Sequence, residues 1–75
     1  MIIYGTTQCP DTMAFLQSCD VKGIPYEFRN ISELPMLKEF LRYRDTSSLF
    51  DEVKARGGVG IPLVVEDDGS LVLKP

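Results

Sequence analysis

Four short β-prone segments constrain the fold of this chain more than any other feature of its sequence. Residues 2–4 form an apolar run that ends at Gly5, and residues 25–31 alternate aromatic with charged side chains. An alternation of period two is typical of a half-buried strand. Residues 63–65 and 71–73 are apolar and are joined through Asp67-Asp68-Gly69, a pattern typical of a hairpin turn. We therefore predict four strands, the last two of them antiparallel neighbours.

A first helix is predicted between the first two strands, over residues 10–22. Pro10 suits the first helical position, where a missing backbone N–H costs nothing, and this makes Cys9 the N-cap. Gly23 ends the helix. Four apolar residues recur at helical spacing and are expected to face the core: Met13, Phe15, Leu16 and Cys19.

Two more helical segments are predicted between the second and third strands. Ser32 is expected to cap a helix that ends near Asp45, and a further segment is expected from residues 46–48 to the Gly57-Gly58 pair. The residues expected to face inward are Leu34, Leu37, Phe40, Leu41, Leu49, Phe50 and Val53. Those expected to face water are Lys38, Glu39, Arg42 and Arg44.

The predicted order of elements is β-α-β-α-α-β-β. Because a helix separates the first two strands, we expect them to pair in parallel. The order then requires a four-stranded mixed sheet with helices packed against it, the α/β class. With 75 residues the chain has room for one domain, residues 1–75.

Composition excludes several classes of function. The net charge is −3 with no cluster of Lys or Arg, which argues against nucleic acid as a partner. The chain has neither an apolar stretch of roughly 18 residues, the length that a membrane helix needs, nor the features of a signal peptide. We therefore expect a cytoplasmic protein with no membrane partner. Histidine is absent, which excludes Cys-His catalysis and histidine zinc sites, and no metal site is predicted.

The strongest candidate for chemistry is Cys9. The start of a helix presents unpaired backbone N–H groups and the positive end of the peptide dipoles, so a sulfur there is favoured as thiolate, the nucleophilic form. A second proline, Pro62, opens the third strand after Val59-Gly60-Ile61. The predicted topology brings these two segments together.

Three segments, Cys9-Pro10-Asp11-Thr12, Ile24-Pro25-Tyr26-Glu27-Phe28 and Gly60-Ile61-Pro62, together resemble the glutaredoxins over nearly the whole chain. The resemblance implies a thioredoxin-like fold and thiol–disulfide exchange in which Cys9 attacks the disulfide. It implies that the backbone of Ile61 binds glutathione, that Pro62 is cis, and that Pro10, Asp11 and Thr12 complete the active-site motif. Glutathione is then a co-substrate, no cofactor is tightly bound, and the protein is a monomer or weak dimer.

The sequence departs from the family at the position of the second cysteine. Thr12 occupies this place, so we expect a monothiol mechanism in which an outside thiol, glutathione, resolves the mixed disulfide. The Thr12 hydroxyl is expected either to donate to the Cys9 sulfur or only to occupy the first helical turn. Cys19 would lie about 15 Å along the helix from Cys9, too far for a disulfide, and is expected to be a buried packing residue.

Charges and the chain end depart from the family as well. Asp11, a negative charge in the first helical turn, opposes ionisation of Cys9, and Arg56 is a candidate to bind a glutathione carboxylate. Lys74-Pro75 replaces the Gly-Gly pair that, in the family, helps to bind the γ-glutamyl end of glutathione. Glutaredoxins normally add a closing helix, and none is predicted here, so we expect either a shortened member of the family or a sheet face that is left apolar and open to a partner.

Three functions remain open. The first is glutathione-linked thiol–disulfide exchange, as described. The second is a monothiol glutaredoxin-like dimer that holds an iron–sulfur cluster through two Cys9 thiolates and two glutathiones, although Pro10 stiffens the loop and argues against it. The third is a domain without catalysis that binds a partner protein.

Overall fold

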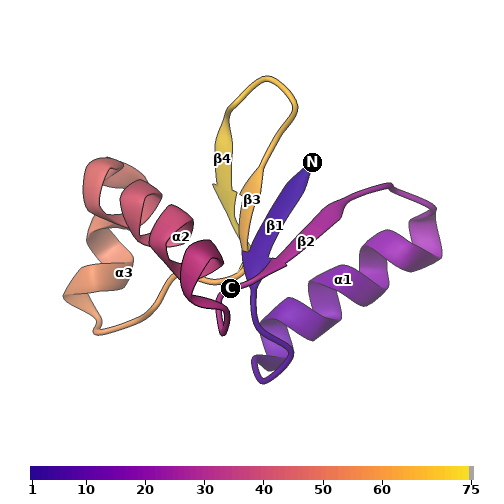
Figure 1. Ribbon diagram of the computed structural model, residues 1–75, viewed down its shortest axis with the longest axis horizontal. Helices are drawn as coiled ribbons and strands as arrows, with labels where there is room; N and C mark the ends of the chain where they lie inside the picture. The colour runs from indigo at the N-terminus through magenta and orange to yellow at the C-terminus, as the bar shows by residue number, and fades with distance from the viewer. Residues whose placement is uncertain (75) are drawn as a thin grey trace.

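A computed structural model describes residues 1–74 and has the predicted order of elements (Figure 1). The strands are β1 (Ile2–Gly5), β2 (Glu27–Asn30), β3 (Leu63–Val65) and β4 (Leu71–Leu73). The helices are α1 (Pro10–Lys22), α2 (Leu34–Thr46) and α3 (Asp51–Ala55), with a 3₁₀ turn, η1 (Ser48–Phe50), leading into α3. Residue 75, one half of the Lys74-Pro75 pair noted above, lies outside the described residues.

The four strands form one mixed sheet in the order β2-β1-β3-β4. β1 pairs with β2 in parallel, and β3 pairs antiparallel with both β1 and β4. The predicted α/β class, parallel first pair and C-terminal hairpin are therefore confirmed. The hairpin turn is wider than a two-residue Asp-Gly turn, because a bond from Glu66 N to the Ser70 carbonyl leaves three residues in the loop, with Gly69 at φ +87°.

Helices cover both faces of the sheet, with α1 on one side and α2 and α3 on the other (Figure 1). Side chains alternate along β1, so Ile3 and Tyr4 serve different faces. Ile3 packs with Leu16, Cys19 and Val64 under α1. Tyr4 packs with Phe40, Phe50, Leu63 and Val65 under α2 and α3. Two hydrophobic clusters, one on each side of the sheet, therefore hold the domain together.

Some predicted boundaries differ from the structure. The second strand is shorter than residues 25–31, because Pro25 and Tyr26 belong to the connection from α1. Ser32 does not cap α2: the N-cap is Glu33, and the Ser32 amide instead donates to Asn30 Oδ1 at 2.9 Å in the preceding turn. Such a short local bond between a side chain and the backbone competes with helix initiation and delays it by a residue.

The buried face of α2 was predicted incorrectly in part. Leu34 is 60% exposed and Leu41 is 38% exposed, whereas Phe40 is fully buried and Leu37 and Tyr43 pack against the same cluster. The predicted stripe of Leu34, Leu37 and Leu41 and the observed stripe of Leu37, Phe40 and Tyr43 both satisfy helical spacing. The structure buries the one that carries the aromatic rings, which remove the larger apolar area from water.

In α1 and in the third helical segment, too, some residues predicted to face the core are exposed, because each element packs only a narrow face against the core. In α1, Met13 is 44% exposed, and Thr12 is buried together with Leu16 and Cys19, of which only the last two were expected. In the third helical segment, Phe50 and Val53 are buried but Leu49 is exposed.

Glu39 and Arg44 were predicted to face water, but each instead connects two parts of the fold. The Tyr4 hydroxyl donates to Glu39 Oε1 at 2.7 Å and accepts from Arg29 Nη1 at 3.0 Å, which joins α2 to β1 and β2. Burial, followed by the bond to Glu39, raises the pKa of Tyr4 to about 12. The same bond is the main cause that lowers the pKa of Glu39. At neutral pH the tyrosine is therefore the proton donor. Arg44 is the second such residue and acts at the loop before β3.

Candidate functional site

Cys9 is held at the start of α1 by its backbone. Its amide donates to the Thr6 carbonyl at 3.1 Å, and its carbonyl accepts from the Met13 amide at 3.1 Å, which begins the helix. The residue has extended backbone angles (φ −99°, ψ 118°), typical of an N-cap, and Pro10 follows at the first helical position as predicted. The Cys9 side chain makes no capping bond and is half-buried, so the thiol remains available for reaction.

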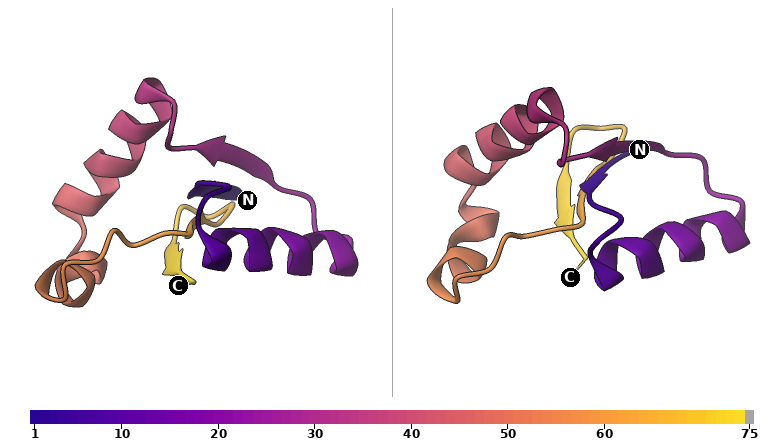
Figure 2. Two further views of the ribbon diagram at one scale, coloured as in Figure 1. Left: turned by 90° about the horizontal axis from the view of Figure 1, so that it is seen from below. Right: turned by 60° about the horizontal axis from the view of Figure 1, so that its bottom comes forward.

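The segment before β3 comes from α3 and approaches Cys9 at the start of α1. In both views of Figure 2 the connection after α3 runs toward the start of α1. Arg44 holds this loop, since its guanidinium donates to the carbonyls of Gly58 at 2.7 Å and Val59 at 2.9 Å. Gly60 follows with φ +93°, and a Cβ there would lie 2.7 Å from the Phe50 ring, so the chain can pass over the ring only with glycine. The Ile61–Pro62 peptide bond is cis, as the resemblance implied.

A pocket of about 510 Å³ joins these two segments. It is lined by Cys9, Asp11, Val53, Arg56, Gly58, Val59, Gly60 and Ile61. Four of the residues singled out from the sequence, Cys9, Asp11, Arg56 and Ile61, therefore line one pocket. Pro10 is exposed beside it, and Pro62 is buried beneath the loop. Neither Pro10 nor Pro62 lines the pocket.

The two charged groups of the pocket are free to meet a ligand. Within residues 1–74, Asp11 and Arg56 form no ion pair with each other or with another residue, and their side chains make no hydrogen bond. The pocket thus presents one thiol, one carboxylate and one guanidinium. Such a site can bind a charged disulfide next to the sulfur nucleophile. The described residues contain no group of three or more Cys, Asp or Glu side chains that could hold a metal ion.

Thr12 does not act as a hydrogen-bond donor to Cys9. Its side chain is fully buried and its hydroxyl has no hydrogen-bond partner of any kind among the described residues. It packs against the end of β1, where a Cβ on Gly5 would lie 2.6 Å from Thr12 Oγ1. Thr12 therefore fills the crossing of α1 and β1, and only the second of its two predicted roles agrees with the structure.

The buried hydroxyl of Thr12 leads to a prediction about stability. We expect Thr12→Val, which replaces the hydroxyl with a methyl group of similar size, to raise the free energy of unfolding by about 1 kcal/mol, because an unpartnered buried hydroxyl costs about 1–3 kcal/mol. Urea unfolding measures the change. Thr46→Val is the control, since the Thr46 hydroxyl does have a partner, the Arg42 carbonyl at 2.7 Å. A loss of stability in Thr12→Val would mean that the hydroxyl is bonded after all.

Sequence reasoning missed Arg44 as a residue that shapes the site. It was placed on the water-facing side of its helix, yet it holds the loop that lines the Cys9 pocket. The only signal in the sequence is the Gly57-Gly58 pair, whose carbonyls are not shielded by side chains and can accept bonds from a long cation. Cys19, by contrast, is 2% exposed and lies in the cluster under α1, which confirms that it is a packing residue.

No helix among residues 1–74 combines the length and the apolar character that crossing a bilayer requires. No protein-family profile matches the chain. No solved structure matches it either. A relative in Haemophilus influenzae (strain ATCC 51907 / DSM 11121 / KW20 / Rd), described as an uncharacterized protein, is 41% identical over 73 residues, which cover 96% of this chain and 85% of the relative. The chain belongs to the same family as this Haemophilus influenzae protein.

Proposed function

We propose that this protein is a glutathione-linked thiol–disulfide oxidoreductase of the glutaredoxin type, with Cys9 as its single nucleophile. The observation that carries the proposal is the pocket in which the half-buried Cys9 thiol meets Arg56 and Ile61. Cys19 is buried in the core and free, so it does not compete for substrate. The mixed four-stranded sheet with helices on both faces supports a thioredoxin-like fold for the family.

The chemistry proceeds in two exchange steps. The Cys9 thiolate attacks the glutathione sulfur of a mixed disulfide, the substrate thiolate leaves, and Cys9 becomes bonded to glutathione. A second glutathione thiolate then attacks the sulfur of the bound glutathione. Oxidised glutathione forms and the Cys9 thiolate is regenerated. Because Thr12 carries no thiol and the Cys19 thiol is buried in the core, the second step requires the external thiol.

The other residues of the pocket bind and position the substrate. The Arg56 guanidinium binds a glutathione carboxylate, and the backbone of Ile61, which lines the same pocket, forms hydrogen bonds with the peptide part of the ligand. Arg44 is a positioning residue, since it holds Gly58 and Val59 at the rim without lining the pocket itself. We also propose a cytoplasmic location, because thiol–disulfide exchange that uses reduced glutathione suits a reducing compartment.

The test is the reduction of the mixed disulfide between glutathione and hydroxyethanethiol, coupled to glutathione reductase. We expect the protein to accelerate this reaction above the rate of glutathione alone. Arg56→Gln is expected to raise the KM for the mixed disulfide about three- to tenfold with kcat little changed, because a partly exposed charge-assisted hydrogen bond contributes about 1 kcal/mol.

Lys54→Gln is the matched control for Arg56. Lys54 is an exposed cation on α3 that does not line the pocket. Its replacement by Gln removes the same charge from the protein as Arg56→Gln does. Its KM should stay within about twofold of the wild-type value. Equal KM values for the two variants would show that Arg56 does not bind the substrate. A wild-type protein that does not accelerate reduction of the mixed disulfide would refute the proposed activity.

A further inference from the structure

A second pocket, of about 490 Å³, lies between α2 and the first two strands. It is lined by Tyr4, Arg29, Glu39, Arg42, Tyr43 and Thr46, and it shares no residue with the Cys9 pocket. Its volume falls within the range of about 300–1,000 Å³ that small-molecule sites occupy. The proposed redox chemistry gives this pocket no role.

One wall of the pocket is a hydrogen-bonded network of side chains. Tyr4 and Arg29 are register partners in the parallel β1–β2 pair, so their side chains stand next to each other on one face of the sheet. Arg29 donates to Tyr4, Glu39 and Glu27, and Tyr4 donates to Glu39. The charge of Arg29 is therefore matched by two carboxylates, and the Tyr4 hydroxyl is fully engaged.

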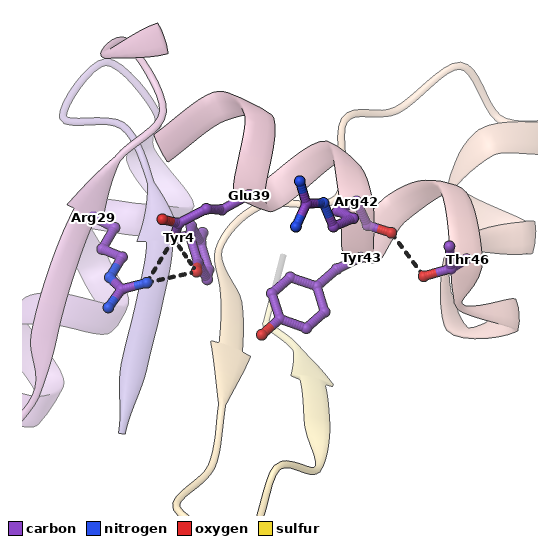
Figure 3. A pocket seen from close by; sticks show the side chains of 6 residues that line it. All are labelled: Tyr4, Arg29, Glu39, Arg42, Tyr43 and Thr46. Atoms are coloured by element: carbon purple, nitrogen blue, oxygen red, sulfur yellow. Dashed lines mark hydrogen bonds and ion pairs between the residues drawn. The ribbon is translucent and has the colours of Figure 1, made fainter. Parts of the chain in front are cut away.

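The α2 side of the pocket carries two groups that remain unpaired. Glu39 and Tyr43 are four residues apart, as are Arg42 and Thr46, so all four belong to one face of α2. Figure 3 shows Arg42 and Tyr43 on α2 next to the Tyr4–Arg29–Glu39 network, and the centroid of the Tyr43 ring lies 5.8 Å from that of the Tyr4 ring. Within residues 1–74 the Arg42 guanidinium and the Tyr43 hydroxyl have no hydrogen-bond or ion-pair partner. Thr46 is already bonded to the Arg42 carbonyl.

The charge of the pocket differs from that of the whole protein. The chain carries 11 acidic and 8 basic residues, yet this pocket has two guanidinium groups against one carboxylate. Since Arg29 is already paired, Arg42 is the cation whose charge remains for a ligand. A guanidinium binds planar oxyanions through two parallel hydrogen bonds, and the Tyr43 ring offers an apolar surface beside it.

We propose that this pocket binds a small organic oxyanion, a carboxylate or phosphate attached to a planar apolar group. Arg42 donates two hydrogen bonds to the oxyanion, the Tyr43 hydroxyl donates a third, and the Tyr43 ring packs against the apolar group. The Tyr4–Arg29–Glu39 network lines the pocket beside the Tyr43 ring. This pocket shares no residue with the Cys9 pocket, so anion binding and the proposed redox function can be tested separately.

Amide chemical shifts of the full ¹⁵N-labelled chain test the proposal. The probes are benzoate, phenyl phosphate and inorganic phosphate, each titrated to millimolar concentrations at constant ionic strength. We expect saturable shifts in β1, β2 and the middle of α2 with at least one of the two aromatic probes, and the stronger of the two identifies the anion as a carboxylate or a phosphate. Inorganic phosphate should bind more weakly than phenyl phosphate, because it lacks the apolar group.

Variants distinguish a specific site from general attraction to cations. Arg42→Gln should weaken binding at least about tenfold, and Tyr43→Phe about threefold, since hydrogen bonds to a charged group are the stronger ones. Lys38→Gln removes an exposed cation from the same helix outside the pocket and should change binding less than about twofold. Equal effects of Arg42→Gln and Lys38→Gln, shifts that do not saturate with either aromatic probe, or binding of inorganic phosphate as tight as that of the stronger aromatic probe would each overturn the proposal.

Discussion

Replacing Cys9 by Ser is expected to reduce the disulfide-reducing activity of the protein to the rate of glutathione alone. Cys9 carries the only thiol among the residues that line the pocket, and the Cys19 thiol is buried in the core. A serine hydroxyl is not ionised at neutral pH and does not attack disulfides. The coupled assay with the glutathione mixed disulfide measures the loss.

The same substitution should leave the fold intact, so that the loss of activity has one cause. The Cys9 side chain makes no capping hydrogen bond, and serine is among the preferred N-cap residues. We therefore expect a melting temperature equal to or slightly above that of the wild-type protein. Cys19→Ala is the matched control: it removes the other thiol and should retain full activity. Activity that survives in Cys9→Ser, or disappears in Cys19→Ala, would contradict the assignment.

The largest expected effect on stability comes from Phe40→Ala. Phe40 is fully buried. Its ring centroid lies 5.9 Å from that of Phe50, in an edge-to-face arrangement, and 6.4 Å from that of Tyr4. Truncating a buried phenylalanine costs about 3–5 kcal/mol. At about 0.05–0.15 kcal/mol per residue, this is a large part of the stability of a small domain. The melting temperature should fall by more than about 12 °C.

Leu34→Ala provides the contrast on the same helix. The sequence pattern alone placed Leu34 in the buried stripe, but its side chain is 60% exposed in the structure. We expect a change in the free energy of unfolding of less than about 0.5 kcal/mol, as is usual for surface positions. Thermal or urea unfolding followed by circular dichroism compares the two variants. Equal destabilisation by both would mean that α2 presents a different face to the sheet.

The order and pairing of elements could be predicted because the local signals agree with each other. Pro10 and Gly23 mark both ends of α1, and Asp68-Gly69 marks the hairpin. The faces of the helices were harder. In α2 two sets of positions satisfy the same periodicity, and the choice between them depends on which side chains fill the space over Tyr4 and Leu63, which is a property of tertiary packing.

The parts of the site that follow from the directions of the strands could be predicted from the sequence. The contacts made by long side chains could not. Cys9 and Ile61 come together because β1 and β3 are neighbours and both segments lie at one end of the sheet. Arg44 and Glu39 looked like surface charges because helical periodicity says nothing about how far a guanidinium or a carboxylate reaches. Only the structure brings Arg44 to the loop at Gly58 and Glu39 to Tyr4.

The most direct test of the account is to identify which sulfur becomes bonded to glutathione. The protein is incubated with oxidised glutathione and analysed by intact mass and by mass spectrometry of its peptides. We predict one glutathione per chain, on Cys9, which added reduced glutathione removes. Glutathione on Cys19, an internal Cys9–Cys19 disulfide, or no adduct at all would contradict the proposal that Cys9 is a lone nucleophile resolved by an outside thiol.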